Sequence, residues 1–180
     1  MSSTKPQVPK WLANASFEDL FLRSESTPLV GQPNGGEASL EAIADSPDLS
    51  PKIRVLAHEL LIEAGHAPDP SLAETYCQTL PDVFLHNAWG MPGRYIERLG
   101  KTVVAFGTAA LPCLVDLFAD QRPLGYFGSE EPTLSEQMRY RVGDLAAYLA
   151  SQIAGIPYRD DPETETRDVF IRKLMTELRG

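Results

Sequence analysis

The sequence lacks long apolar runs and period-two alternation, and each absence excludes a class of protein. No stretch of the 180 residues approaches the roughly 18 consecutive apolar residues of a membrane span, so no membrane insertion is expected. Residues 1–10 contain no apolar segment of the kind found in secretory signals, so a cytoplasmic location is the expectation. Apolar and polar residues do not alternate for more than a few positions, which argues against a protein built from β-strands.

Cysteine is also scarce, with two residues in the whole chain. Cys77 and Cys113 both lie in helix-like contexts among leucine, valine and tyrosine. A free cysteine usually behaves as a small buried apolar residue, and that is the role we expect for both. The count permits a disulfide, but nothing in the sequence argues for one.

Positive charge is the third shortage. The chain has 16 Lys and Arg residues against 25 Asp and Glu residues, a net charge of -9. Without a local basic patch, such a molecule repels phosphate backbones, so no nucleic-acid partner is expected. Residues 37–74 carry eight carboxylates against Lys52 and Arg54. A basic protein is therefore the favoured partner for any surface that binds through charge; the alternative is a solvated acidic surface that aids solubility.

What the sequence does contain is a series of helix signals within a chain that is 43% hydrophobic. Ser50-Pro51 and Asp69-Pro70 each place a capping residue before a proline, which is typical of a helix start. Residues 1–10 are expected to form a flexible tail and residues 11–180 a single all-α domain, with no strand longer than an isolated bridge. The expected helices cover residues 17–22, 38–44, 51–64, 70–86 with a kink at Pro81, 96–106, 108–119, 133–154 and a last segment that begins at Pro162.

One motif occurs twice, first at residues 40–57 and again at residues 114–147. Each copy is an apolar helix that ends in aspartate, a turn, and a second helix that opens with Arg-Val. This pattern resembles HEAT-like helical repeats over roughly residues 38–155, although the second copy holds an insertion of about a dozen residues. The resemblance implies a compact α-solenoid of about seven or eight antiparallel helices that acts as a protein-interaction scaffold. It carries over no catalytic residue.

The same resemblance implies a role for the acidic and basic residues that flank each turn. In HEAT-like repeats the aspartate that ends one helix often pairs with the arginine that opens the next. Asp45 with Arg54 and Asp120 with Arg141 are expected to brace the two turns in this way. The alternative is that these four residues are unrelated surface charges.

Chemical motifs are weak throughout the sequence. His58 and His66 flank acidic residues, but metalloprotease spacing requires a second histidine at position 62, which is Ile62. Ser129 lacks the two flanking glycines of a nucleophile elbow. We therefore expect no catalytic residue, no metal site and no cofactor.

Two long segments are the best candidates for a binding surface. If successive helices alternate in direction, residues 87–95 and 120–133 fall at the same edge of the stack, where binding surfaces are often built. Both are rich in aromatic and arginine side chains, which dominate interface energetics. These residues fill the centre of a partner surface or, alternatively, turn inward and plug the core. The predicted partner-binding residues are Trp89, Met91, Arg94, Tyr95, Arg122, Tyr126 and Phe127.

The function expected from the sequence is a non-catalytic protein-protein interaction or scaffold module, with another protein as its partner. Two alternatives remain open. One is a hydrolase-type enzyme with its site at the same loop-rich edge, and the other is an acidic antagonist of a basic protein.

Overall fold

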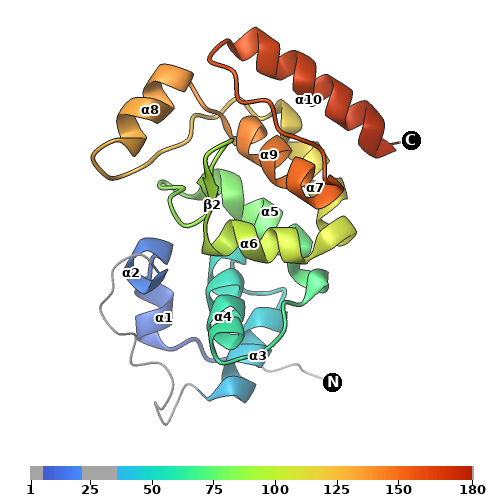
Figure 1. The fold of residues 1–180 in the computed structure, drawn as a ribbon. Helices are drawn as coiled ribbons and strands as arrows, with labels where there is room; N and C mark the ends of the chain where they lie inside the picture. The colour runs from blue at the N-terminus through green and yellow to red at the C-terminus, as the bar shows by residue number, and fades with distance from the viewer. Residues whose placement is uncertain (1–5, 22–35, 180) are drawn as a thin grey trace.

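The computed structural model describes residues 6–21 and 36–179, of which 64% are helical. These residues form ten α-helices joined by turns and short 3₁₀ helices (Figure 1). The helices are α1 (Lys10–Asn14), α2 (Phe17–Phe21), α3 (Glu37–Asp45), α4 (Pro51–Glu63), α5 (Ala73–Thr79), α6 (Arg98–Ala105), α7 (Leu111–Asp116), α8 (Glu131–Met138), α9 (Val142–Ala154) and α10 (Thr164–Arg179). The 3₁₀ helices are Pro70–Leu72, Leu80–Asp82, Gly107–Ala110 and Leu117–Ala119.

The two helix starts marked by proline are confirmed. Helix α4 begins at Pro51, and Pro70 opens the 3₁₀ turn that leads into α5. At the second start the Asp69 carboxylate accepts a hydrogen bond from the Ser71 N–H at 2.9 Å, as expected of a capping aspartate. Local sequence signals therefore determine where these segments begin.

The expected long helix over residues 133–154 is wrong, because the chain breaks in its middle. Arg139 adopts φ 52° and ends α8, and Arg141 then caps α9. The Asp144 carboxylate accepts from the Arg141 N–H at 2.9 Å, which is one half of a capping box; the Asp144 N–H donates to the Arg141 main-chain carbonyl at 2.9 Å. No glycine or proline lies at residues 139–141, but the repeated motif, whose second helix opens with Arg-Val, does predict a helix start at this point. The expected helix over residues 70–86 likewise ends early, in the 3₁₀ helix Leu80–Asp82.

Residues 87–95 are not a simple loop either. They contain strand β1 (Gly90–Met91), which pairs antiparallel with β2 (Tyr95–Ile96) in a two-stranded hairpin. The prediction of no strand beyond an isolated bridge therefore needs correction. The hairpin exists because Gly90 takes φ 120° and leaves room for the Tyr95 and Ile96 backbone.

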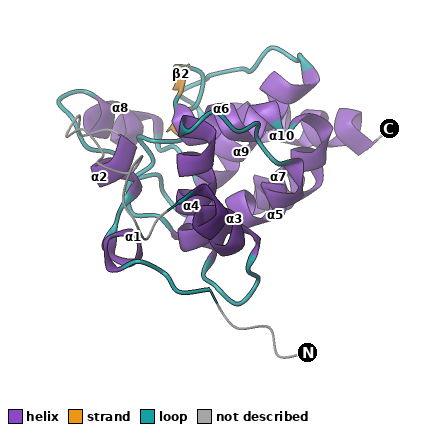
Figure 2. Ribbon diagram, turned by 90° about the horizontal axis from the view of Figure 1, so that it is seen from below, coloured by secondary structure: helices purple, strands orange, loops and turns teal. Residues whose placement is uncertain are grey.

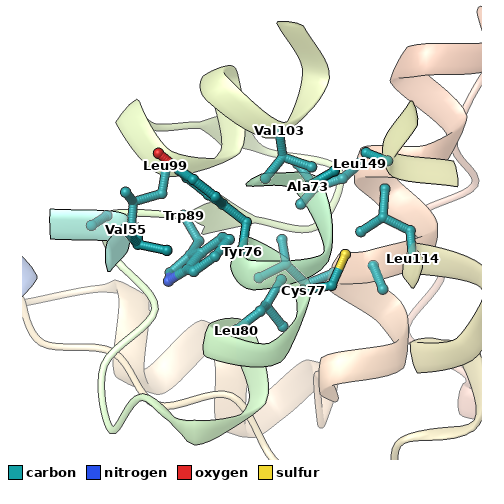
Figure 3. Close-up of a cluster of buried hydrophobic side chains, with 14 of the residues drawn as sticks. Val55, Ala73, Tyr76, Cys77, Leu80, Trp89, Leu99, Val103, Leu114 and Leu149 are labelled. Carbon is teal, nitrogen blue, oxygen red and sulfur yellow. The ribbon is translucent and has the colours of Figure 1, made fainter. Parts of the chain in front are cut away.

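Helix α9 is the most deeply buried helix in the described residues. Every residue from Val142 to Ser151 is buried, and α6, α7 and α10 pack against it. Helix α4 packs between α3 and α5, and α5 in turn contacts α7. Figure 3 shows how side chains from α4, α5, α6, α7 and α9, together with Trp89 just before β1, meet in one core. Both copies of the repeated motif thus form packed helix pairs, α3 with α4 and α7 with α9.

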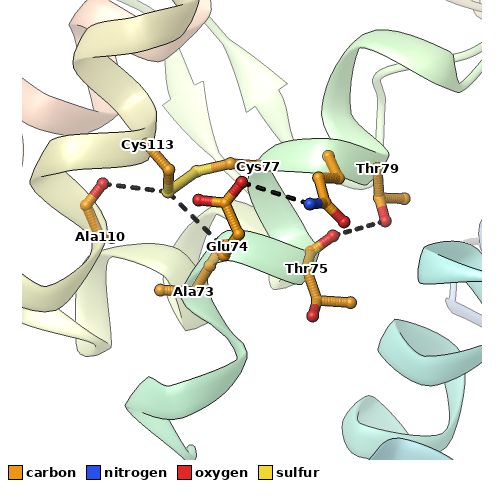
Figure 4. Close-up of a disulfide and its surroundings, with 8 residues drawn as sticks. Ala73, Glu74, Thr75, Cys77, Thr79, Ala110 and Cys113 are labelled. Atoms are coloured by element: carbon orange, nitrogen blue, oxygen red, sulfur yellow. Dashed lines mark hydrogen bonds between the residues drawn. A yellow bond between two sulfur atoms is a disulfide. The ribbon is translucent and has the colours of Figure 1, made fainter. Parts of the chain in front are cut away.

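The two cysteines form a disulfide, which corrects the expectation that they are free. Cys77 lies on α5 and Cys113 on α7, with their Cα atoms 5.9 Å apart (Figure 4). Both residues are buried, as expected from their apolar contexts. The two cysteines lie 36 positions apart in sequence, so the bond joins two helices that are distant along the chain. Spacing alone could not reveal this pairing, because it depends on the packing of α5 against α7.

The expected ion pair between Asp45 and Arg54 is replaced by a main-chain contact. Arg54 Nε donates to the carbonyl of Ala44 at 2.8 Å, one residue before the aspartate. The arginine therefore braces the turn between α3 and α4, because it satisfies one of the free carbonyls at the end of α3.

The expected ion pair between Asp120 and Arg141 is also wrong. Asp120 accepts from Arg122 at 2.6 Å within its own loop, and Arg141 binds Asp144 and Asp168 at 3.0 and 2.7 Å. Asp120 and Arg141 therefore each pair with a different residue that lies closer. The backbone still braces the turn, since the Gly143 N–H donates to the Asp120 carbonyl at 3.0 Å.

In the described residues no single helix has both the length and the apolar content of a membrane span. A bent pair made of Arg98–Ala105 and Gly107–Ala119, with 108° between its halves, meets these two criteria together.

Candidate functional site

The two long segments predicted to share one edge do meet. His86 and Asn87 sit just before the hairpin and bind the main chain of residues 125–127. Asn87 Nδ2 donates to the Phe127 carbonyl at 2.9 Å, and its Oδ1 accepts from the Phe127 N–H at 2.9 Å. His86 Nδ1 accepts from the Gly125 N–H at 3.1 Å. These contacts hold the second loop against the first.

Tyr126 adds a third contact between the loops. Its hydroxyl donates to the Gly90 carbonyl at 2.8 Å, and burial raises the pKa of this hydroxyl well above its usual range. It therefore remains a hydrogen-bond donor at neutral pH. This bond fixes β1 of the hairpin to the loop that leads into α8.

Three of the seven predicted partner-binding residues belong to the core. Trp89, Met91 and Tyr126 are 0%, 1% and 8% exposed. The Trp89 ring packs edge-on against Tyr76, with ring centroids 6.2 Å apart (Figure 3), and against Phe17, with ring centroids 6.5 Å apart. For these three side chains the alternative interpretation, that they plug the core, is the one the structure favours.

The other four predicted residues reach the surface. The Phe127 residue is 41% exposed, and the side chains of Arg94 and Arg122 are 50% and 54% exposed. Tyr95 is partly buried; burial and the nearby Glu131 raise its pKa to about 12, so it stays neutral. One apolar ring and two guanidinium groups therefore remain available for contact from the two loops.

Both arginines are held in place by carboxylates. Arg94 Nε lies 3.2 Å from Asp160 Oδ2, and the Tyr140 hydroxyl donates to Asp160 Oδ1 at 2.7 Å. Arg122 binds Asp120 at 2.6 Å and Asp82 at 3.1 Å. Hydrogen bonds from Arg122 lower the pKa of Asp120, so this pair stays charged at neutral pH. Side chains fixed in this way lose less conformational entropy when a partner binds.

A hollow lies beside the second loop. It has a volume of about 620 Å³ and is bordered by residues 121–126, α8 and the turn at 139–141. Leu124, Tyr126 and Tyr140 supply its apolar lining, while Glu136 and Arg139 supply charged groups. The predicted edge therefore combines a concave surface with exposed residues, which is how many recognition sites are shaped.

A second polar cluster lies between α4, α5 and the start of α6, around His58, which lacks the spacing of a metalloprotease histidine pair. His58 Nε2 accepts from the Asp69 N–H at 3.0 Å, which leaves Nδ1–H to donate to the Tyr76 hydroxyl at 2.8 Å. Tyr76 donates to Glu59 Oε1 at 2.7 Å, and Arg98 Nε donates to Glu59 Oε2 at 2.8 Å. The chain of hydrogen bonds joins three helices.

This cluster is closed to a substrate. His58 and Glu59 are 3% and 0% exposed, and the described bonds occupy both ring nitrogens and both carboxylate oxygens. Glu59, one of the eight carboxylates of residues 37–74, therefore does not belong to a solvated acidic surface. In the described part of the chain, no three histidine, cysteine or acidic residues are grouped so as to hold a metal ion. The cluster serves to join helices.

Burial lowers the pKa of His58 from 6.5 to about 4. The unfolded chain therefore binds a proton at this histidine between pH 6.5 and 4 while the folded protein does not, so stability falls as the pH drops through that range.

We expect His58→Gln to be less stable than the wild type at pH 7 by about 1–3 kcal/mol. We expect this difference in the free energy of unfolding to shrink toward pH 4. Urea unfolding over a pH series measures both quantities, with His66→Gln as the control. A pH-independent difference would contradict the neutral role of His58.

A third cluster, which the sequence did not reveal, surrounds Asp144 on α9. Its carboxylate accepts from Arg141 Nε and Nη2, each at 3.0 Å, and from Arg167 Nε at 3.1 Å. Arg167 is 0% exposed and also donates to the carbonyls of Asp161 and Met138 at 2.6 and 2.9 Å. Burial alone raises the pKa of Asp144, but the hydrogen bonds from the two arginines outweigh it and hold the value below normal. This cluster fixes α10 to the turn between α8 and α9.

Comparisons with protein-family models, with curated proteins and with solved structures find no match to this chain. The resemblance to HEAT-like repeats therefore stays a prediction.

Proposed function

We propose that the chain is a non-catalytic protein-interaction module that binds another protein at the edge formed by residues 87–95 and 120–133. The observation that carries the proposal is the fixed pairing of these loops through Asn87 and Tyr126. The two loops also carry the exposed Phe127, two arginines that are oriented by carboxylates, and a hollow of about 620 Å³ that borders residues 121–126. A preorganised edge of this kind has less entropy to lose on binding.

The solenoid architecture is part of the same proposal. Its support is the packing of α3 on α4 and of α7 on α9, the two pairs that the repeated motif predicts. Stacked helix pairs provide a rigid frame on which loops of one edge can vary.

The polar groups near the hollow support binding rather than bond cleavage. The Tyr140 hydroxyl already donates to Asp160, and Arg141 is engaged by Asp144 and Asp168. Each therefore holds the fold together. The net charge of -9 favours a basic partner through long-range attraction.

The test compares variants of the immobilised protein in capturing partners from a lysate of the native organism, read by quantitative mass spectrometry. We expect Phe127→Ala and Arg94→Ala each to weaken capture of the specific partner by about fivefold or more, the loss of a hot-spot residue. Thr108→Ala is the control, because Thr108 is exposed in the turn after α6, which leads away from the hairpin. Equal capture by all variants would reject the edge as the binding surface.

A further inference from the structure

Helix α10 lies at the outside of the molecule and contacts the rest of the fold through one face. It packs on α9; Figure 1 shows it at the outer boundary of the fold, and in Figure 2 its C-terminal end projects beyond the other helices. Arg167, Ile171 and Leu174 form its buried face. Residues 165, 169, 172, 173 and 176 on the opposite face are exposed, so that face is available for an interaction.

An apolar side chain lies at the centre of this available face. Val169 is 58% exposed, one of three large hydrophobic residues with such exposure in the described ranges. It borders a groove of about 600 Å³ between α10 and the segment before it, whose apolar lining includes Ile156, Phe170 and Leu174. An exposed apolar residue beside an apolar groove is a feature of interaction surfaces.

Charged residues flank Val169 symmetrically. Glu165 lies four residues before it and Lys173 four residues after it, and both also border the groove. The Lys173 side chain is 75% exposed and has only a loose contact of 3.7 Å with Glu177. Four residues of α-helix advance about 6 Å, so the acidic and the basic group stand at equal distances on either side of Val169.

We propose that this face binds a second copy of the same chain, with the two α10 helices antiparallel about a two-fold axis at Val169. In that arrangement residue 165 of each helix lies opposite residue 173 of the other, because the two positions are equally distant from the axis. Glu165 of each copy then faces Lys173 of the other copy, which gives two ion pairs. The two Val169 side chains contact each other at the two-fold axis. A two-fold interface requires this self-complementarity.

The order of the charges selects this arrangement over others. Parallel helices in register would place Glu165 against Glu165 and Lys173 against Lys173, which is repulsive. A uniformly basic or acidic partner would leave one of the two charges opposed. The surface on α10 contains none of the residues proposed for the loop edge, so the two proposals can be tested independently.

Sedimentation velocity over low to high micromolar concentrations tests the proposal with charge reversals. We expect a wild-type dimer that Val169→Glu weakens by about tenfold or more, as expected for a central contact. Glu165→Lys and Lys173→Glu alone should each weaken it by about three- to tenfold, because each turns two attractive contacts into repulsive ones. The double variant Glu165→Lys/Lys173→Glu should return affinity to near the wild-type value.

Glu74→Lys is the matched control, since it makes the same charge change at an exposed position on α5. All the substituted side chains are exposed, and circular dichroism confirms that each variant keeps its helices. A wild type that stays monomeric at the highest concentration overturns the proposal. So does a double variant that dimerises no better than the two single variants.

Discussion

Replacing Asp144 by asparagine is expected to lower the free energy of unfolding by about 3–5 kcal/mol, the typical result of breaking a buried charge pair from one side. Asp144 is 0% exposed and is the acceptor for both Arg141 and Arg167. The amide is similar in shape but uncharged, and its NH₂ group can only donate. Arg167, which is also 0% exposed, would then remain charged in the core with main-chain carbonyls as its acceptors. Urea unfolding followed by circular dichroism measures the loss.

Asp168→Asn is the matched control for this prediction. Asp168 also accepts from Arg141, at 2.7 Å, but its side chain is 37% exposed, so its loss should cost about 1 kcal/mol or less. Because the pKa of Asp144 is lowered in the folded protein, its contribution is present above pH 3.8 and is lost as the pH falls further. The gap between wild type and Asp144→Asn should therefore narrow in strong acid. If Asp144→Asn and Asp168→Asn lowered the free energy of unfolding by the same amount, burial would not be the reason for the importance of Asp144.

The clusters around Asp144 and Glu59 explain which parts of the fold the sequence could predict. Helix starts such as Ser50-Pro51 depend on neighbouring residues, and the structure places them as expected. Glu59 lies on a helix whose pattern suggests an exposed acidic face. Its carboxylate is buried instead, because Arg98, 39 positions away, donates a hydrogen bond to it and offsets the cost of burying its charge. Periodicity describes one element at a time. It cannot identify a charged partner on another element.

The same limit applies to the break between α8 and α9. Arg139 ends α8 in the left-handed region without a glycine, and Arg167 donates to the carbonyls of Met138 and Arg139 at 2.9 and 3.3 Å. These carbonyls lie at the end of α8, where a continuous helix would have used them internally. A residue from α10 thus supports the break, and its sequence position gives no hint of that role.

For the candidate site, the sequence identified the two loops but not the direction of their side chains. Trp89 and Phe127 are both large aromatic residues in turn-rich segments, yet they are 0% and 41% exposed. Trp89 is buried partly because Gly100 lets α6 approach its carbonyl, where a Cβ atom would collide. Composition indicates that aromatic side chains are present at an edge, whereas tertiary packing decides which of them a partner can touch.

Removing the disulfide is the other change with a large expected effect. The bond between Cys77 and Cys113 closes a segment of 36 positions, and such a loop restricts the unfolded chain by about 3–4 kcal/mol. We expect Cys113→Ala to lose that amount in non-reducing urea unfolding, because both sulfurs lie in the core and the alanine also leaves a small void.

The control for this prediction is reduction of the wild type. Dithiothreitol should bring wild-type stability close to that of Cys113→Ala and leave the variant unchanged, since the variant has no bond to lose. If wild type and variant unfold alike without reductant, the two thiols are not joined in solution.

The redox state of the two cysteines also bears on the location of the protein, because disulfides persist mainly in oxidising compartments and the cytosol keeps most thiols reduced. A bond found by non-reducing mass spectrometry in protein taken directly from its native organism would therefore argue against the cytoplasmic location expected from the sequence, and fully reduced cysteines would support it.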